Sequence, residues 1–162
     1  VHRKTKNFAE AMQCFEEQLT LAKELGDKTG IAVAKGNIGK VFIDYSDNSK
    51  ALDCFDFQLK IFEELGDKTG ISMAKANLGI VYQKTKEFSK ALTCFDEAIA
   101  IGTELKQNFS LCSYLLNKAK LLQAVNKPHE AEKAAKESLK TAETAKRKKI
   151  IIQAKEFLKN SV

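Results

Sequence analysis

The side chains that could carry catalysis are few in this chain, and their spacing does not form an active-site pattern. His2 and His129 are the only histidines, and neither lies in an HExxH or Cys-x-x-Cys motif. The segment Gly-Asp-Lys-Thr-Gly at 26–30 lacks the spacing of a phosphate-binding loop. Four nearby carboxylates are expected to be helix-start and surface charges: Asp44, Asp47, Asp53 and Asp56. We therefore expect no enzyme activity, no cofactor and no metal.

The cysteines follow a fixed spacing. Cys14, Cys54 and Cys94 are forty residues apart and each precedes a phenylalanine, while Cys112 stands alone. Equivalent residues of neighbouring helical units lie about 10 Å apart, which is too far for a disulfide. We expect all four to be small buried residues of a protein in a reducing compartment, which favours the cytoplasm.

An identical octamer, ELGDKTGI, occurs at 24–31 and again at 64–71. Aligned without gaps, residues 26–65 and 66–105 share 21 identities in 40 positions, and the pattern continues more weakly on both sides. Within each unit, apolar residues recur every three or four positions, which is helical spacing. The octamer therefore predicts a helix end, a glycine-capped corner and an Asp-capped helix start.

The forty-residue period predicts an all-α fold in which one domain consists of stacked helix pairs. A half unit covers 1–25, full units cover 26–65, 66–105 and 106–145, and a partial unit or capping helix covers 146–162. Residues 1–6 resemble the end of an earlier helix, so the chain is expected to be a fragment. The expected helices lie near 8–25, 28–45, 48–65, 68–85, 88–105, 108–125, 128–145 and 148–160.

The units resemble the tetratricopeptide repeat family. The motif residues of the second unit are Leu78-Gly79, Tyr82, Ala91, Phe95 and Ala98, and those of the first are Ile38-Gly39, Phe42, Ala51 and Phe55. The resemblance implies a right-handed superhelical solenoid of antiparallel helix pairs. The forty-residue period resembles the long-helix variant of cell-polarity adaptors and bacterial signalling proteins.

The chain departs from the family pattern at several positions. Lys40 and Ile80 stand where polarity adaptors carry asparagine. The third unit has Lys118, Ala119, Leu122 and Ala135 in place of the aliphatic, glycine, aromatic and phenylalanine residues. Phe57 and Phe62 replace polar or glycine counterparts, and we expect them to be buried rather than exposed contacts.

The resemblance implies a peptide-binding groove lined by the first helix of each pair. The expected groove residues are Val33, Asn37, Lys40 and Asp44, then Met73, Asn77, Ile80 and Lys84, then Asn117, Lys120 and Ala124. The three asparagine amides can both donate to and accept from a peptide backbone, and the lysines can attract carboxylates. Alternatively, the amides cap or cross-link helices and the lysines are only solvated.

The net charge of +6 is concentrated near the C-terminal end, with +5 in residues 126–162. We expect the cations of AKRKK at 145–149 to lie near a helix C-terminus; the alternatives are an acidic-partner or nucleic-acid patch. Nucleic-acid binding along the chain is not favoured, and no apolar run is long enough for a membrane helix. The expected function is a non-catalytic module that binds a protein or peptide; the alternative is self-association through the incomplete terminal units.

Overall fold

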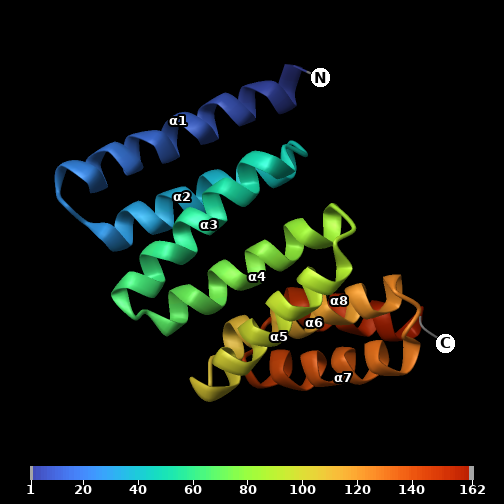
Figure 1. The fold of residues 1–162 in the computed structure, drawn as a ribbon. Coiled ribbons are helices and arrows are strands. Elements are labelled where there is room, and N and C mark those ends of the chain that lie inside the picture. The colour runs from blue at the N-terminus through green and yellow to red at the C-terminus, as the bar shows by residue number, and fades with distance from the viewer. Residues whose placement is uncertain (1, 161–162) are drawn as a thin grey trace. The chain divides into compact units, whose positions relative to one another are not determined.

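Eight helices account for nearly all of the chain in the computed structural model, which describes residues 2–160 and their side chains from Phe8 onward (Figure 1). Within this range there is no β-strand. The helices are α1 (His2–Glu24), α2 (Lys28–Asp44), α3 (Asn48–Leu65), α4 (Lys68–Lys84), α5 (Phe88–Glu104), α6 (Asn108–Ala124), α7 (Pro128–Thr144) and α8 (Lys148–Lys159). The predicted all-α architecture is confirmed, and most helix ends agree with the sequence to within one residue.

The start of α1 differs from the prediction, because the helix runs without a break from His2 instead of starting near residue 8. Lys6 stands at the repeat position where Ser46, Lys86 and Asn126 adopt positive φ angles in the later corners. A left-handed conformation costs a non-glycine residue about 1–2 kcal/mol. At Lys6 the chain avoids this cost because α1 continues as a helix through the position.

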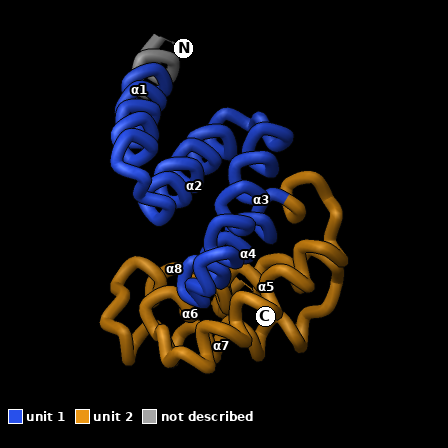
Figure 2. The backbone as a smooth tube through the Cα atoms, turned by 60° about the vertical axis from the view of Figure 1, so that its left-hand side comes forward, with its two compact units in different colours: residues 1–81 blue, residues 82–162 orange. Residues whose placement is uncertain are grey.

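The chain divides into two compact units, residues 1–81 and 82–162 (Figure 2). In the first unit, α1 packs against α2 and α2 against α3. In the second unit, α5 packs against α6, α6 against α7 and α7 against α8. Each unit is thus built from helices that contact their neighbours in sequence, as expected of a repeat fold.

Corners between one helix pair and the next begin with a left-handed residue. Gly26 and Gly66 both have φ +66°, and the following aspartates, Asp27 and Asp67, accept hydrogen bonds from the backbone N–H groups of residues 30 and 70 at 2.9 and 3.0 Å. A left-handed C-terminal glycine followed by an aspartate cap is the arrangement that the octamer predicted. The two copies of ELGDKTGI therefore make two equivalent corners.

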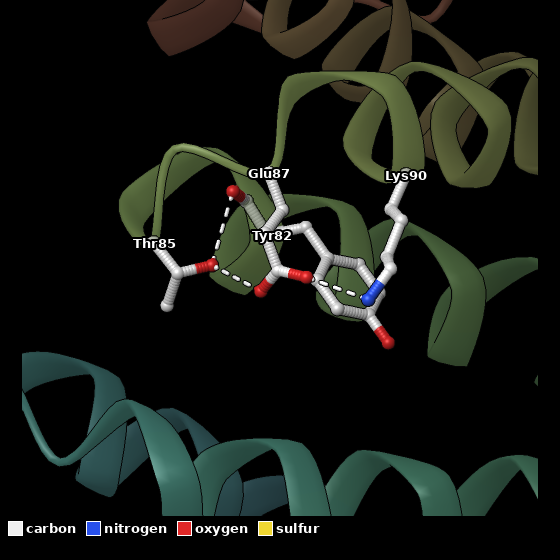
Figure 3. A network of polar contacts seen from close by, with 4 residues as sticks. All are labelled: Tyr82, Thr85, Glu87 and Lys90. Atoms are coloured by element: carbon white, nitrogen blue, oxygen red, sulfur yellow. Dashed lines mark hydrogen bonds and ion pairs between the residues drawn. The ribbon is translucent and has the colours of Figure 1, made fainter.

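Corners within a helix pair also begin with a left-handed residue, and Asp47 likewise caps its helix by accepting a hydrogen bond from the N–H of Lys50 at 3.2 Å. These corners add an ion pair between residues three positions apart. Lys50 Nζ lies 2.9 Å from Asp47 Oδ2, and in the next repeat Lys90 Nζ lies 2.6 Å from Glu87 Oε2. Figure 3 shows this second corner: Lys90 also lies over the Tyr82 ring, 5.2 Å from its centroid, and the hydroxyl of residue 85 bonds the Glu87 carboxylate. The Lys90 hydrogen bond lowers the pKa of Glu87. These contacts fix how the second helix of a pair leaves the corner.

The core of each pair depends on close approach between its two helices. A Cβ atom on Gly39 would lie 2.8 Å from the ring of Phe55, which is completely buried. Gln58 Nε2 donates to the carbonyl oxygen of Ala32 at 3.0 Å, and at the same repeat position in the second unit Ser138 Oγ donates to a carbonyl at 2.6 Å. Two of the repeats thus share a buried side-chain bond between their helices that is made by different residues, whereas the repeat between them has Ala98 at this position.

Side-chain sizes are matched across the corners between pairs. Phe62, 1% exposed, lies against Gly70, where an added Cβ would approach the ring to 2.3 Å. At the equivalent positions of the second unit, Ala142 and Ile150 share one buried cluster. At these two corners a large residue on one helix is therefore paired with a small one on the next, in either order, whereas the equivalent positions of the other two corners are Ala22 with Gly30 and Gly102 with Ser110. The expected burial of Phe62 is confirmed.

Candidate peptide-binding surface

The predicted stripe on α2 is only partly exposed. Val33 is 41% exposed and Lys40 and Asp44 are exposed, whereas Asn37 is half-buried. These residues follow one another at steps of three or four, so they share one face of α2. Ala34 and Ile38 on the opposite face pack into the core with Leu19. On α2, the residues predicted for the core are thus buried, and the predicted stripe combines exposed residues with the half-buried Asn37.

The corresponding stripe on α4 is more enclosed. Met73 and Ile80 are half-buried, and Met73 packs against the buried cluster of Ala32, Ile61 and Phe62. Met73 is therefore partly a core residue as well as a groove candidate. Lys84, at the end of α4, is exposed.

Asn77 is the most distinctive of the predicted residues. It is 8% exposed, and its Nδ2 atom is fully buried without a hydrogen-bond partner. A buried amide donor that is left unpaired costs about 1–3 kcal/mol. Most buried polar groups in proteins are satisfied, so an orphaned one needs an explanation.

The stripe on α6 resembles that on α2. Asn117 is half-buried, and Lys120 and Ala124 are exposed. This helix belongs to the second unit, whereas α2 and residues 68–81 of α4 belong to the first. Each stripe is therefore a candidate surface of its own unit.

The asparagine side chains were predicted either to bind a peptide or to cap or cross-link helices. Among the described residues, no hydrogen bond joins the side-chain amide of Asn37, Asn77 or Asn117 to a neighbouring helix. In contrast, the buried Gln58 and Ser138 do make such bonds. The described helices are thus cross-linked by Gln58 and Ser138, and the Asn77 amide donor stays buried and unpaired in the free chain.

The lysines of the stripes carry unpaired charges. Lys40, Lys84 and Lys120 are exposed and form no ion pair with any described residue. Other lysines of the chain are paired, for example Lys136 with Glu132 at 2.6 Å. The stripes thus combine amide groups with free positive charge, which suits a ligand with backbone amides and carboxylates.

The thiols differ more than the sequence suggested. Cys54 and Cys112 are buried, and burial raises the pKa of both thiols. Cys94 is half-buried, but Cys14 is exposed, so the expectation of burial is wrong there. Gly39 of α2 lies against Cys54, and the described residues place no helix in the corresponding position beside Cys14.

Two sequence models of one family match the chain. Both describe the tetratricopeptide repeat, and they match residues 70–144 and 1–29, which together make up more than half of the chain. The chain belongs to the tetratricopeptide repeat family. No curated protein matches its sequence.

Several solved structures share this fold with the tetratricopeptide repeat chain. The apo form of RapI has a TM-score of 0.84 at 20% identity over 97% of this chain and 62% of RapI. BtubC from P. vanneervenii has a TM-score of 0.78 at 18% identity, over 98% of this chain and 70% of BtubC. Aspartyl phosphate phosphatase F from Bacillus subtilis has a TM-score of 0.85 at 14% identity, over 94% of this chain and 40% of the phosphatase chain. These likenesses show an all-α helical repeat solenoid.

The third repeat departs from the family pattern with a structural consequence that the sequence did not predict. Lys118 occupies the position where Ile38 and Leu78 are buried, and its Nζ atom reaches Asp96 Oδ1 at 2.6 Å. The aliphatic part of a lysine can cover apolar surface while its charge reaches solvent. Beside it, α5, α6 and α7 line a cleft of about 290 Å³. The repeat period reveals that Lys118 replaces an aliphatic residue, but it does not predict the pairing with Asp96, because Asp96 lies on a different helix.

Two aromatic and basic features also differ from the predictions. Phe57 is 43% exposed with Lys35 Nζ 5.4 Å from its ring centroid, so the expected burial of Phe57 is wrong. Helix α7 ends at Thr144, so of the AKRKK cations only Lys146 and Arg147 follow a helix C-terminus. Lys148 and Lys149 lie in the first turn of α8, where the helix dipole disfavours cations. The expectation for this segment is therefore wrong for half of its cations.

Within residues 2–160, no helix combines the length and the apolar character needed to cross a lipid bilayer.

Proposed function

We propose that this tetratricopeptide repeat chain is a non-catalytic protein-interaction module of the cytoplasm that binds an extended peptide along the first helices of its pairs. The observation that carries the proposal is the buried, unpaired amide donor of Asn77. A group that costs stability in the free protein is explained if a ligand supplies the missing acceptor, and because the Nδ2 atom is buried the Asn77 side chain must turn outward to meet it. The repeat fold supports a protein partner, because stacked helical repeats are used as extended binding surfaces.

The recognition we propose is of the peptide backbone rather than of one sequence. In the first unit, Asn37 on α2 and Asn77 on α4 would supply the amides. Val33 on the stripe of α2 and Met73 and Ile80 on the stripe of α4 would supply apolar contacts. An amide can pair with both the N–H and the C=O of a bound strand. In the second unit, the corresponding group is Asn117 with the neighbouring Lys120.

The partner we propose has acidic character. The free ammonium groups of Lys40, Lys84 and Lys120 are exposed, so each retains mobility and solvation until a carboxylate approaches. Exposed ion pairs contribute little affinity individually, about 0–1 kcal/mol, but they raise the association rate and bias the choice of partner. Packed helices lose little conformational entropy on binding, which favours a preformed surface.

The proposal is tested by affinity capture from the native lysate with quantitative mass spectrometry. The Asn37→Ala/Asn77→Ala variant is compared with the wild-type chain and with Gln83→Ala/Gln123→Ala, which also removes two helical side-chain amides. We expect the asparagine variant to lose specific partners that the glutamine variant retains. Equal recovery by all three proteins would remove the support for the groove assignment.

A second candidate function, self-association, is favoured by one observation on α8. Ile152 is 57% exposed, although its repeat equivalents Ala32, Ser72 and Cys112 are completely buried. An apolar helix position left uncovered is a candidate contact for a second copy. Light scattering of the wild-type chain and Ile152→Ser separates the proposals, because self-association predicts a concentration-dependent mass that the substitution lowers. A monomer at all concentrations would exclude this candidate.

A further inference from the structure

Two corners of the second unit lie side by side, and together they carry a cluster of cations that form no ion pair with a described residue. Arg147 Nη1 donates to the carbonyl oxygen of Phe109 at 3.0 Å, and the guanidinium carbon lies 3.7 Å from the centroid of the Phe109 ring. These contacts join the α7–α8 corner to the start of α6. We call this region the basic corner surface, and it consists of Lys106, Phe109, Lys146, Arg147, Lys148 and Lys149.

The basic corner surface replaces a device that stabilises the first unit. There, Asp27 and Asp67 cap the following helix through backbone hydrogen bonds. Arg147 stands at their repeat position and makes no helix cap, and Phe109 stands where the octamer has a threonine. Phe109 is 64% exposed, although Arg147 covers one face of its ring. At this corner of the second unit, Arg147 therefore does not cap the following helix as the aspartates do, and its guanidinium group lies over the exposed ring of Phe109.

The remaining cations are not explained by the fold. Lys146, Lys148 and Lys149 are exposed, and none forms an ion pair with a described residue. Lys148 and Lys149 occupy the first turn of α8, where positive charge opposes the helix dipole. These ammonium groups oppose the dipole of α8 and form no ion pair with a described residue, and an external anionic partner would offset that cost.

We propose that the basic corner surface docks an acidic, unstructured segment of a partner protein and that one apolar side chain of the segment packs against Phe109. Complementary charge would draw the segment in, and the exposed part of the Phe109 ring would fix its register. A nucleic acid fits less well, because Arg147 already covers one ring face that a base would stack on.

The test uses the full 162-residue chain and a fluorescein-labelled probe peptide of glutamates and glycines with one central leucine, followed by fluorescence anisotropy. We expect Lys146→Gln/Lys148→Gln/Lys149→Gln to weaken binding at least tenfold at about 50 mM NaCl and salt to weaken the wild-type complex. Phe109→Ser should weaken binding of this probe severalfold but leave binding of a leucine-free probe unchanged. Circular dichroism checks that both variants keep the helical content of the wild type.

The control variant removes the same charge elsewhere: Lys60→Gln/Lys133→Gln/Lys140→Gln changes three exposed lysines outside the surface. We expect less than a twofold effect from it, and none from Asn37→Ala/Asn77→Ala, so failure of this proposal is distinguishable from failure of the groove. Three results would overturn the proposal: equal loss in the control variant, no loss in the corner variant, or tighter binding of a single-stranded oligonucleotide at the same lysines.

Discussion

Replacing Asn77 by alanine should stabilise the protein, although the residue is buried. The gain has two parts: removal of the unpaired Nδ2 donor, about 1–3 kcal/mol, and the better helix propensity of alanine, about 0.6 kcal/mol. Against these stands the lost packing of the amide group, about 1–2 kcal/mol at a site that is 8% exposed. The expected net effect is a gain of about 1 kcal/mol in the free energy of unfolding.

Urea unfolding followed by circular dichroism at 222 nm measures this effect. With a slope of about 2 kcal/mol per molar urea, the midpoint should rise by about 0.5 M without a change of slope. Asn37→Ala is the matched control, because Asn37 occupies the same repeat position but is half-buried and has no orphaned buried atom. Its gain should be limited to the helix-propensity part.

The reasoning would be refuted if Asn77→Ala lowered the free energy of unfolding by more than about 1 kcal/mol while Asn37→Ala did not. That result would mean that the Asn77 amide is satisfied within the free protein, for example by a buried water. The peptide-binding proposal would then lose the observation on which it depends.

Three further predictions concern packing, thiol reactivity and pH. Phe62→Ala should lower the free energy of unfolding by about 3–5 kcal/mol, measured by urea unfolding. Adding Gly70→Ile recreates the small–large pair of Ala142 and Ile150 and should recover part of this loss. If the losses of the two single variants simply add, size matching is contradicted. Cys14 should react with a maleimide much faster than Cys112, whose thiol is buried with a raised pKa, and equal rates would contradict the burial. The lowered pKa of Glu87 means that its ion pair stabilises the fold above the unfolded pKa and is lost as pH falls through the folded pKa. Glu87→Gln should therefore lower Tm slightly at pH 6, and this difference should disappear as pH falls through the lowered pKa of Glu87. A pH-independent difference would oppose this assignment.

The sequence predicted the helices well because their ends are marked by local chemistry. Gly26 and Gly66 end helices through left-handed caps, and Asp27 and Asp67 begin the next ones, so each boundary depends on residues within one turn. The forty-residue period then predicted the equivalent helix ends at corners that lack the glycine–aspartate pair. The one large error is the start of α1, which was predicted near residue 8 but lies at His2. That start was predicted from the forty-residue period alone, without a local capping residue.

The side-chain environments were less predictable, because they depend on contacts between helices. Phe57 and Phe62 lie on the same helix, yet only Phe62 has a glycine opposite it that leaves room for burial. Likewise, the pairing of Lys118 with Asp96 joins residues of different helices. The candidate stripes follow from helical periodicity, but the orphaned amide of Asn77 appears only when the surrounding side chains are placed.

The central claim, that partners bind along the first helices, is tested most directly by site-specific photo-cross-linking. A benzophenone amino acid is placed either at Val33, in the predicted stripe of α2, or at Phe57 on α3, which is exposed to a similar extent, 43% against 41%. We predict cross-links from position 33 to an extended, acidic segment of a partner, which are lost in the Asn37→Ala/Asn77→Ala background. Cross-links that form from position 57 and not from position 33 would contradict the account.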